Sequence, residues 1–251
     1  MGDFIYDINP IISFAKNVII EYDEPERNVP WQVFTGHPLN SILLYKSAGI
    51  FRDEEHVSSL PHVSGAKPGD IIIEDYDKNG SITSDDRVIF EKTADPKLTY
   101  GIGFNLNYKN WLLTGLIQGA GSTLRSMSSD LQTGSIGNYF AYEAVDRWTP
   151  DNKDASKPRA YEREEEYWRS NYVTDYNYQL GAYARLKNIQ LSYTLPKQWL
   201  DFIMVKEASL YVSAANALLL YNQNKILDPE ARDMQEYPIM KTYTIGAKIT
   251  F

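Results

Sequence analysis

The sequence lacks several features that would each define a class of protein. It has no cysteine, which excludes disulfide bonds and thiolate metal sites. It has no run of about 18 apolar residues, so no membrane-spanning helix is predicted. Its net charge of -8, without a cluster of Lys and Arg, argues against nucleic-acid binding. Met1 is not followed by the basic and apolar regions of a signal peptide, so we expect an intracellular protein or a mature polypeptide that starts elsewhere.

The sequence also lacks a recognisable set of catalytic residues. The histidines His37, His56 and His62 lie in one segment, with no Ser or Cys partner at a recognisable spacing. The carboxylates of residues 162–166 are interleaved with arginine, which indicates a solvated charged surface rather than a glycosidase pair. We therefore predict that the chain is not an enzyme.

The last eleven residues show what the sequence does contain. Apolar and polar side chains alternate there, which is the pattern of a strand with two different faces. A two-faced strand of about 9–11 residues that ends on an aromatic residue is typical of a transmembrane β-barrel. A half-buried strand of a soluble sheet has the same alternation. The apolar positions are Tyr243, Ile245, Ala247, Ile249 and Phe251.

Five further segments have strand patterns, and the connections between them alternate in length. A tight turn at 109–110 and a short link at 197–206 alternate with long connections at 21–97, 122–181 and 221–240. Barrels of outer membranes have short periplasmic turns and long extracellular loops, so we assign the three long connections to the extracellular side. A soluble sandwich would show turn signals at both ends of its strands. The five segments are 4–20, 98–108, 111–121, 183–195 and 208–220.

The first long connection holds a candidate calcium loop. Residues 75–80 match the start of the pattern D-x-[DN]-x-[DN]-G, and Gly80 stands where the loop turns sharply. The usual Glu at the twelfth position is replaced by a shorter Asp, which weakens the expected affinity. An Asp/Asn-Gly turn on a solvated loop is the alternative. The predicted ligands are Asp75, Asp77, Asn79, Ser81 and Asp86.

The middle connection is rich in aromatic residues, including Trp148, Tyr167 and Trp168. Tyr and Trp are enriched at interfaces, and their rings can stack on sugars. These three side chains are therefore candidates for contact with a lid protein or a substrate. Packing of the connection against itself is the alternative.

Five stretches of the sequence form a further set of motifs, and the most specific runs from Tyr183 to Pro196. The others are Pro68–Arg87, Leu98–Tyr108 with Gln118-Gly119, Asp146–Pro150, and a group of short motifs between Val212 and Phe251 that includes Asp228-Pro-Glu230. Together these stretches resemble the C-terminal portion of SusC/RagA-family TonB-dependent outer-membrane transporters of Bacteroidota, and they cover about residues 60 to 251 in the order of the family.

The resemblance implies an all-β fold, in which about six antiparallel transmembrane strands form part of an outer-membrane barrel of roughly 22 strands. It also implies a SusD-like lipoprotein lid, energy from TonB, a glycan or peptide substrate, and assembly machinery that reads the terminal Phe251. Six strands cannot close so wide a barrel, and the family's plug and TonB-contacting segment have no counterpart in the sequence. We therefore expect a fragment, a truncated product or part of a split transporter. The alternative is a soluble, calcium-stabilised β-rich module for binding or adhesion at the cell surface.

Overall fold

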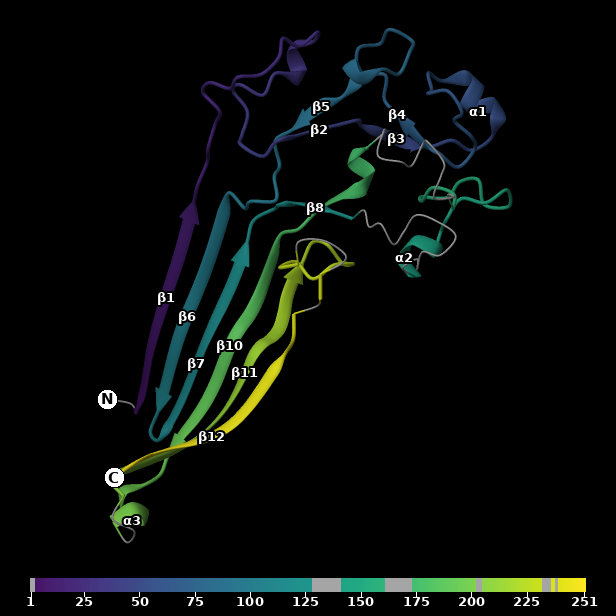
Figure 1. Cartoon of the computed structure of the whole chain (residues 1–251). Coiled ribbons are helices and arrows are strands. Elements are labelled where there is room, and N and C mark those ends of the chain that lie inside the picture. Colours follow the sequence, from purple (N-terminus) through teal and green to yellow (C-terminus); the bar gives the residue numbers. More distant parts are fainter. Residues whose placement is uncertain (1–2, 128–140, 161–172, 202–204, 232–235, 238) are drawn as a thin grey trace.

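The structure is a computed structural model that describes residues 3–127, 141–160, 173–201, 205–231, 236–237 and 239–251. It consists of one long six-stranded sheet and a group of short elements beyond one end of that sheet (Figure 1). Among the described residues, no helix has the length and apolar character needed to cross a membrane.

All neighbouring strands of the large sheet run antiparallel, in the order β1-β6-β7-β10-β11-β12. The six predicted strands are confirmed, although the first ends at Phe14 and not at residue 20. β1 and β12 form the two edges, so the sheet is open and no barrel closes among the residues that the structure describes. The strands are β1 (Phe4–Phe14), β6 (Leu98–Tyr108), β7 (Trp111–Ala120), β10 (Tyr183–Thr194), β11 (Glu207–Asn222) and β12 (Thr242–Thr250).

The register of the strands separates apolar from polar residues. Because side chains alternate along a strand, residues paired across neighbouring strands share a face. One such row crosses all six strands with large side chains only, and it defines the apolar face: Tyr6, Leu106, Leu113, Leu191, Val212 and Ile245. The adjacent row defines the polar face: Asp7, Asn105, Thr114, Gln190, Ser213 and Thr244.

Aromatic rings cover glycines of β7. A Cβ added at Gly119 would collide with the ring of Tyr100 and with the carbonyl oxygen of Tyr183. The Tyr100 hydroxyl crosses β7 at this glycine and donates a hydrogen bond of 2.8 Å to that carbonyl. Glycine in a strand often marks a close approach of this kind, so the glycines allow the rings to lie flat on the sheet.

The two ends of the sheet differ in the length of their connections. At the turn end, where both termini lie in Figure 1, β6 and β7 are joined by Lys109 and Asn110, and Lys109 has a positive φ of 53°. The link from β10 to β11 at that end contains the short helix α3 (Lys197–Leu200). The long connections all leave from the opposite end, which we call the loop end. The predicted alternation of short and long connections is therefore confirmed.

The first long connection is folded rather than irregular. Two short apolar runs of this connection are strands: β2 pairs with β5, and β4 pairs with β3. The elements are η1 (Pro30–Gln32), β2 (Ile42–Leu44), β3 (Ser47–Ile50), α1 (Glu54–Ser59), β4 (Ile71–Ile73), η2 (Ser84–Asp86) and β5 (Val88–Phe90). The second connection adds β8 (Leu124–Ser126), α2 (Ala141–Ala144), η3 (Asp175–Asn177) and β9 (Tyr178–Leu180).

The first and second connections are held together by buried contacts. The fully buried carboxylate of Asp70 accepts a 2.7 Å bond from Nε of Arg159, and the Arg159 amide donates to the Gly69 carbonyl at 2.8 Å. Asp175 accepts bonds of 2.7 and 2.6 Å from the amide and hydroxyl of Ser47. Residues 30–97, 141–160 and 173–180 thus form one unit, which we call the loop module. Its small cores contain Phe51, Val57 and Ile72, and Tyr45, Val63 and Ile73.

Candidate functional site

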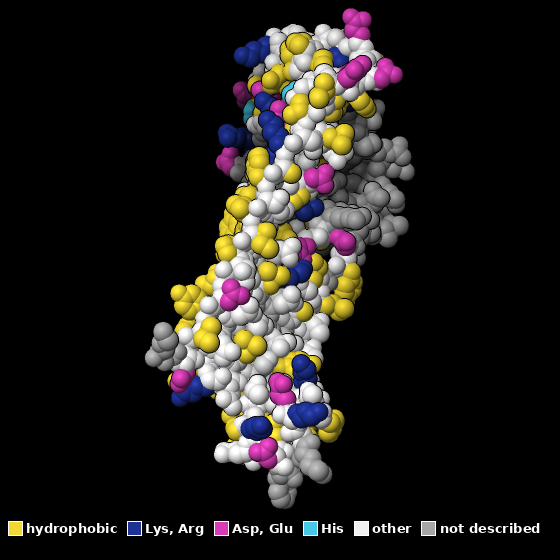
Figure 2. Space-filling model, turned by 90° about the vertical axis from the view of Figure 1, so that its left-hand side faces the viewer, with side chains coloured by type: hydrophobic (Ala, Val, Ile, Leu, Met, Phe, Trp, Pro, Cys, Tyr) yellow, Lys and Arg dark blue, Asp and Glu magenta, His cyan; other side chains and the backbone are white. Residues whose placement is uncertain are grey.

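The apolar face is most exposed on the two edge strands of the sheet and partly exposed on the strands between them. Ile245 on β12 is 86% exposed and Ile12 on β1 is 76% exposed, and Figure 2 shows hydrophobic side chains along the β1 edge. Soluble monomers rarely expose apolar patches of this extent, because such surface associates in water. The face therefore requires an apolar environment.

Aromatic residues bound the apolar face toward both ends. At the turn end Phe4, Tyr108, Trp111 and Tyr193 follow one another across four strands, and the rings of Trp111 and Tyr193 lie 4.6 Å apart. Toward the loop end, Tyr100 and Tyr221 are on the same face. Apolar bands flanked by aromatic girdles are the mark of strands that cross a membrane.

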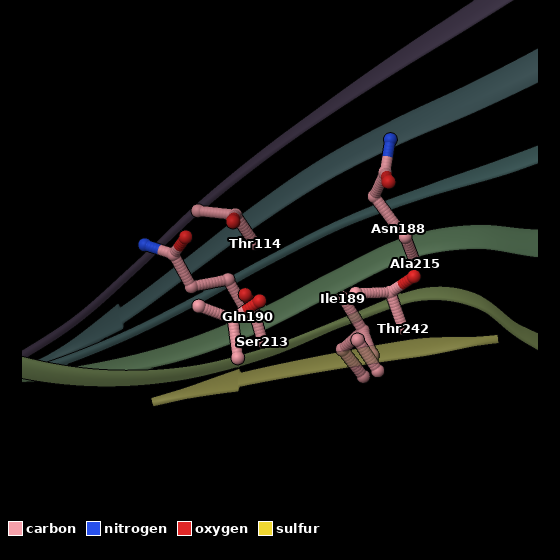
Figure 3. A pocket seen from close by; sticks show the side chains of 9 residues that line it. Thr114, Asn188, Ile189, Gln190, Ser213, Ala215 and Thr242 are labelled. Carbon is pink, nitrogen blue, oxygen red and sulfur yellow. The ribbon is translucent and has the colours of Figure 1, made fainter. Parts of the chain in front are cut away.

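The polar face carries a shallow pocket of about 220 Å³. Asn188 and Gln190 rise from one side of β10, while Ile189 points to the other side (Figure 3). The hydroxyls of Thr114, Ser213, Thr242 and Thr244 complete a lining that has no charged residue. The pocket can offer hydrogen bonds to a neutral polar group.

The predicted calcium ligands are brought together only in part. Carboxylate oxygens of Asp75, Asp77 and Asp86 all lie within 4.8 Å of one another. Asp86 is 0% exposed, and its oxygens accept bonds from the amides of Tyr76 at 2.8 Å and Thr83 at 2.7 Å. These bonds and the Thr83 capping box explain how a carboxylate is held in the interior.

The other two predicted ligands, Asn79 and Ser81, form hydrogen bonds within the loop. The side chain of Asn79 accepts a 2.8 Å bond from the Ser81 amide and donates one of 2.8 Å to Asp77. Three acidic side chains so close together repel one another in their charged forms, and a cation would relieve that repulsion. The residue types therefore fit an oxygen-liganded divalent ion.

Trp148 occupies a structural position inside the loop module. Its ring lies against Gly69, where an added Cβ would come within 2.6 Å of it, and Nε1 donates a 3.1 Å bond to the carbonyl of Arg52. This placement accords with packing of the connection against itself. Tyr167 and Trp168 lie outside the described residues.

The terminal strand has the predicted two faces. Tyr243, Ile245 and Ile249 are exposed on the apolar face, and Phe251 follows the last residue of β12 and is also exposed. The unpaired edge of β12 leaves backbone groups available to another strand.

The architecture defines the class of protein: an open antiparallel sheet with one apolar and one polar face, short turns at one end and long loops at the other, is part of the wall of a membrane β-barrel. Solved structures agree with this fold. The chain superimposes on a chain of the RagAB peptide importer in its open-open state with a TM-score of 0.74 and 19% identity. The superposition covers 99% of the present chain and 27% of the importer chain. The RagAB peptide transporter gives a TM-score of 0.72 at 17% identity, with 99% and 27% covered.

Curated relatives identify the kind of barrel. The chain is 30% identical over 236 residues to TonB-dependent receptor P3 of Formosa agariphila, covering 86% of this chain and 22% of the receptor. It is 27% identical over 237 residues to TonB-dependent receptor P26 of the same organism, with 87% and 22% covered. No protein-family model matches the chain. The resemblance to TonB-dependent transporters is confirmed, and the chain spans about a fifth of the length of these relatives.

The comparisons also bear on activity. The proteins that the chain matches are receptors and a peptide importer, which are transporters and not enzymes. They agree with the prediction that the chain is not an enzyme, and they favour the transport interpretation over the soluble binding or adhesion module.

Proposed function

We propose that this chain forms part of the barrel wall of a TonB-dependent transporter in the outer membrane. The observation that carries the proposal is the apolar face, which continues without a charged residue through the row from Tyr6 to Ile245 across all six strands. The strands are 9 to 16 residues long, enough for a tilted strand to span a bilayer, which takes about 9–11 residues. The remaining strands of a barrel of roughly 22 lie outside this chain.

The polar face then lines the interior of the barrel, and the loop module faces the cell exterior. The similarity to the RagAB peptide importer supports a peptide as substrate, and the family resemblance supports an oligosaccharide as well. The loop module would provide the surface on which a SusD-like lipoprotein lid sits. TonB would act through a part of the protein outside this chain.

The pocket of the polar face supports a role in passage of such substrates. Its amide and hydroxyl groups can exchange hydrogen bonds with sugar hydroxyls or peptide groups, and no charge in its lining would hold an ionic ligand tightly. Weak, repeated contacts of this kind suit a wall along which a substrate moves.

Orientation can be tested with single cysteines in the complete transporter. Ser58 in α1 and Gln198 in α3 are both exposed, and they lie at the loop end and the turn end. We expect a membrane-impermeant maleimide to label Ser58→Cys on intact cells, and to label Gln198→Cys only after the outer membrane is permeabilised. Equal labelling of both on intact cells would contradict the proposed orientation.

The second proposal concerns the acidic loop. We propose that Asp75, Asp77, Asn79, Ser81 and Asp86 hold a Ca²⁺ ion that stiffens the loop module. Support comes from the convergence of three carboxylates and from the position of the loop: Trp31 donates to the Asp85 carbonyl at 2.9 Å, and the buried Gln32 donates to the Ser84 carbonyl at 2.7 Å. An ion at this place would stabilise the contact between η1 and η2.

Calorimetric titration of the complete transporter with Ca²⁺ tests the site. Asp77→Asn removes one charge from the loop, and we expect it to weaken binding about tenfold or more because affinity depends on ligand charge. Asp154→Asn, an exposed acidic residue that faces Arg52, is the matched control and should leave binding unchanged. The same affinity in both variants would contradict the site.

A further inference from the structure

The third long connection folds back onto the sheet immediately after β11. Asn222 donates a 3.1 Å bond to the Leu227 carbonyl, and the Asn224 side chain accepts the amides of Ile226 and Leu227 at 3.0 and 3.2 Å. Asn224 and Ala231 are only 1% and 2% exposed. The segment 222–231 is therefore a compact turn with a buried interior.

Two carboxylates of this turn meet two cations of β10. Nη2 of Arg185 lies 2.7 and 2.6 Å from the two carboxylate oxygens of Asp228, and Nζ of Lys187 lies 2.7 Å from Glu230. Nη1 of Arg185 is 4.0 Å from Glu230, which joins the two pairs into one network. The Arg185 side chain is only 4% exposed. We call these four residues the latch.

A β-bulge explains why both cations reach the same turn. The pairing of β10 shifts between Leu186 and Asn188. Relative to β7, Lys187 is an extra residue, and on the β11 side it has no register partner because residues 216 and 217 lie together in the gap opposite it. A bulge bends a strand and redirects a side chain. Arg185 belongs to the polar face, opposite Gln118, and the bulge allows Lys187 to reach the turn that Arg185 binds.

The second connection contributes to the same turn. Nη2 of Arg125 on β8 donates a 3.4 Å bond to the carbonyl of Pro229, which lies between the two carboxylates. The Ser122 hydroxyl donates a 3.0 Å bond to Gln223. The turn is thus tied to β10 and to the second connection at once.

We propose that the latch is a conformational device that holds the third connection against the polar face and couples its position to the second connection. The inference rests on the proposed function, because only in a barrel does the polar face line a passage. A buried ion pair adds little net stability, but removal of one partner leaves a buried charge without compensation. The latch therefore favours one position of residues 222–231 over positions in which a charge is left buried without its partner.

The device has a consequence for the passage. With the latch closed, residues 222–231 cover Arg185 and lie over the wall of the passage at the loop end. With the latch open, the cations of Arg185 and Lys187 face the passage and the turn is free to move away. The latch residues are positioning residues, since they act through the placement of the connection.

Thiol accessibility in the complete transporter tests the latch. This chain has no cysteine of its own, so a thiol introduced into it is a specific reporter once any cysteines in the rest of the transporter are replaced. Ala231→Cys places a thiol of similar size at a buried position next to the latch. We expect a maleimide to react slowly with it, and Asp228→Asn to raise the rate about tenfold or more, because the turn then opens more often.

Four controls separate the possible results. Asp228→Glu keeps the charge and should retain most of the protection, and the exchanged pair Arg185→Asp with Asp228→Arg should restore part of it. Asp154→Asn removes an exposed ion pair and should have no effect. Ser58→Cys labelling on intact cells reports the orientation separately, so its loss would contradict the proposed function and not the latch. The proposal of a latch would be overturned if Ala231→Cys reacted equally slowly, or equally fast, with and without the Asp228→Asn substitution.

Discussion

The sheet and the loop module solve the problem of apolar surface in opposite ways. The module buries its large apolar residues in small cores around Phe51 and Tyr45, whereas the sheet leaves residues such as Ile12 and Ile245 exposed. The module also uses buried polar contacts, of which Asp70 with Arg159 is the clearest.

The difference shows where each region obtains its stability. The module carries its own interior and is held by specific contacts between segments far apart in the sequence. The sheet is held by backbone ladders, and its apolar face is satisfied only by a surrounding apolar phase. A substitution should therefore act through side-chain partners in the module, and through the side of the strand that it occupies in the sheet.

The largest effect is expected from Asp70→Asn in the module. The change removes the charge of a fully buried carboxylate that accepts a 2.7 Å bond from Nε of Arg159, and breaking a buried ion pair typically costs about 3–5 kcal/mol. Hydrogen exchange across residues 45–73 and 146–160 would measure the loss of local stability. Asp154→Asn, in an exposed pair, should cost less than about 1 kcal/mol. Equal protection in the two variants would mean that the module does not depend on the buried pair.

Next in size is Ile189→Arg on the apolar face. A charged residue near the middle of a membrane strand costs about 2–4 kcal/mol, and unfolding of the complete transporter in bilayers would measure it. Gln190→Arg changes the neighbouring residue on the polar face and should stay within about 0.5 kcal/mol. If both substitutions were equally tolerated, the apolar face would not contact lipid.

A smaller effect is expected from Gly119→Ala in the sheet. The added methyl group has no room between Tyr100 and the Tyr183 carbonyl, and overpacking costs about 1–3 kcal/mol. Gly101→Ala is the matched control, because the nearest atom to its Cβ would be 3.7 Å away. The same unfolding assay compares the two. A neutral Gly119→Ala would show that the Tyr100 ring can leave the glycine freely.

The smallest effect concerns Glu24 in the first connection. Hydrogen bonds from the backbone amides of Phe34 and Thr35, each 3.0 Å long, lower the pKa of Glu24 from its ordinary value of 4.5. A lowered pKa means that this carboxylate stabilises the fold above pH 4.5, and that the contribution is lost as the pH falls through the lowered pKa. Exchange protection of the Phe34 amide should decline over that range. Glu24→Gln should remove the pH dependence.

Much of the sheet was predictable from the sequence. Alternation in Leu98–Tyr108 and the turn at Lys109 located β6 and β7 to within a residue, because period-2 patterns and tight turns are local signals. The bulge at Lys187 was not predicted, since one additional residue in a long strand leaves the alternation on both sides intact. The open edges at β1 and β12 follow from the number of strands and were expected.

The contacts of the loop module and the latch depend on distant pairs. Ile71–Ile73 was visible as an apolar run, but its partner β3 was not, because a strand of three residues carries no register information. Arg185 and Lys187 are two residues apart, as are Asp228 and Glu230, and this shared spacing was the one available signal for the latch. The acidic loop was predicted from a motif, and its three carboxylates do converge.

The two ends of the first connection lie next to each other, and this bears on how the chain folds. β1 and β6 are adjacent in the sheet although Phe14 and its partner Leu98 are separated by 83 residues, and the Ala15 amide meets the Lys97 carbonyl at 2.8 Å. Closing a flexible loop of this length carries an entropic cost that grows with the logarithm of its length. If the loop module forms first, residues 15 and 97 are already near each other and much of that cost is met before the strands pair. The hairpin of β6 and β7 would then form early, and β1 would join it at a rate set by the folding of the module.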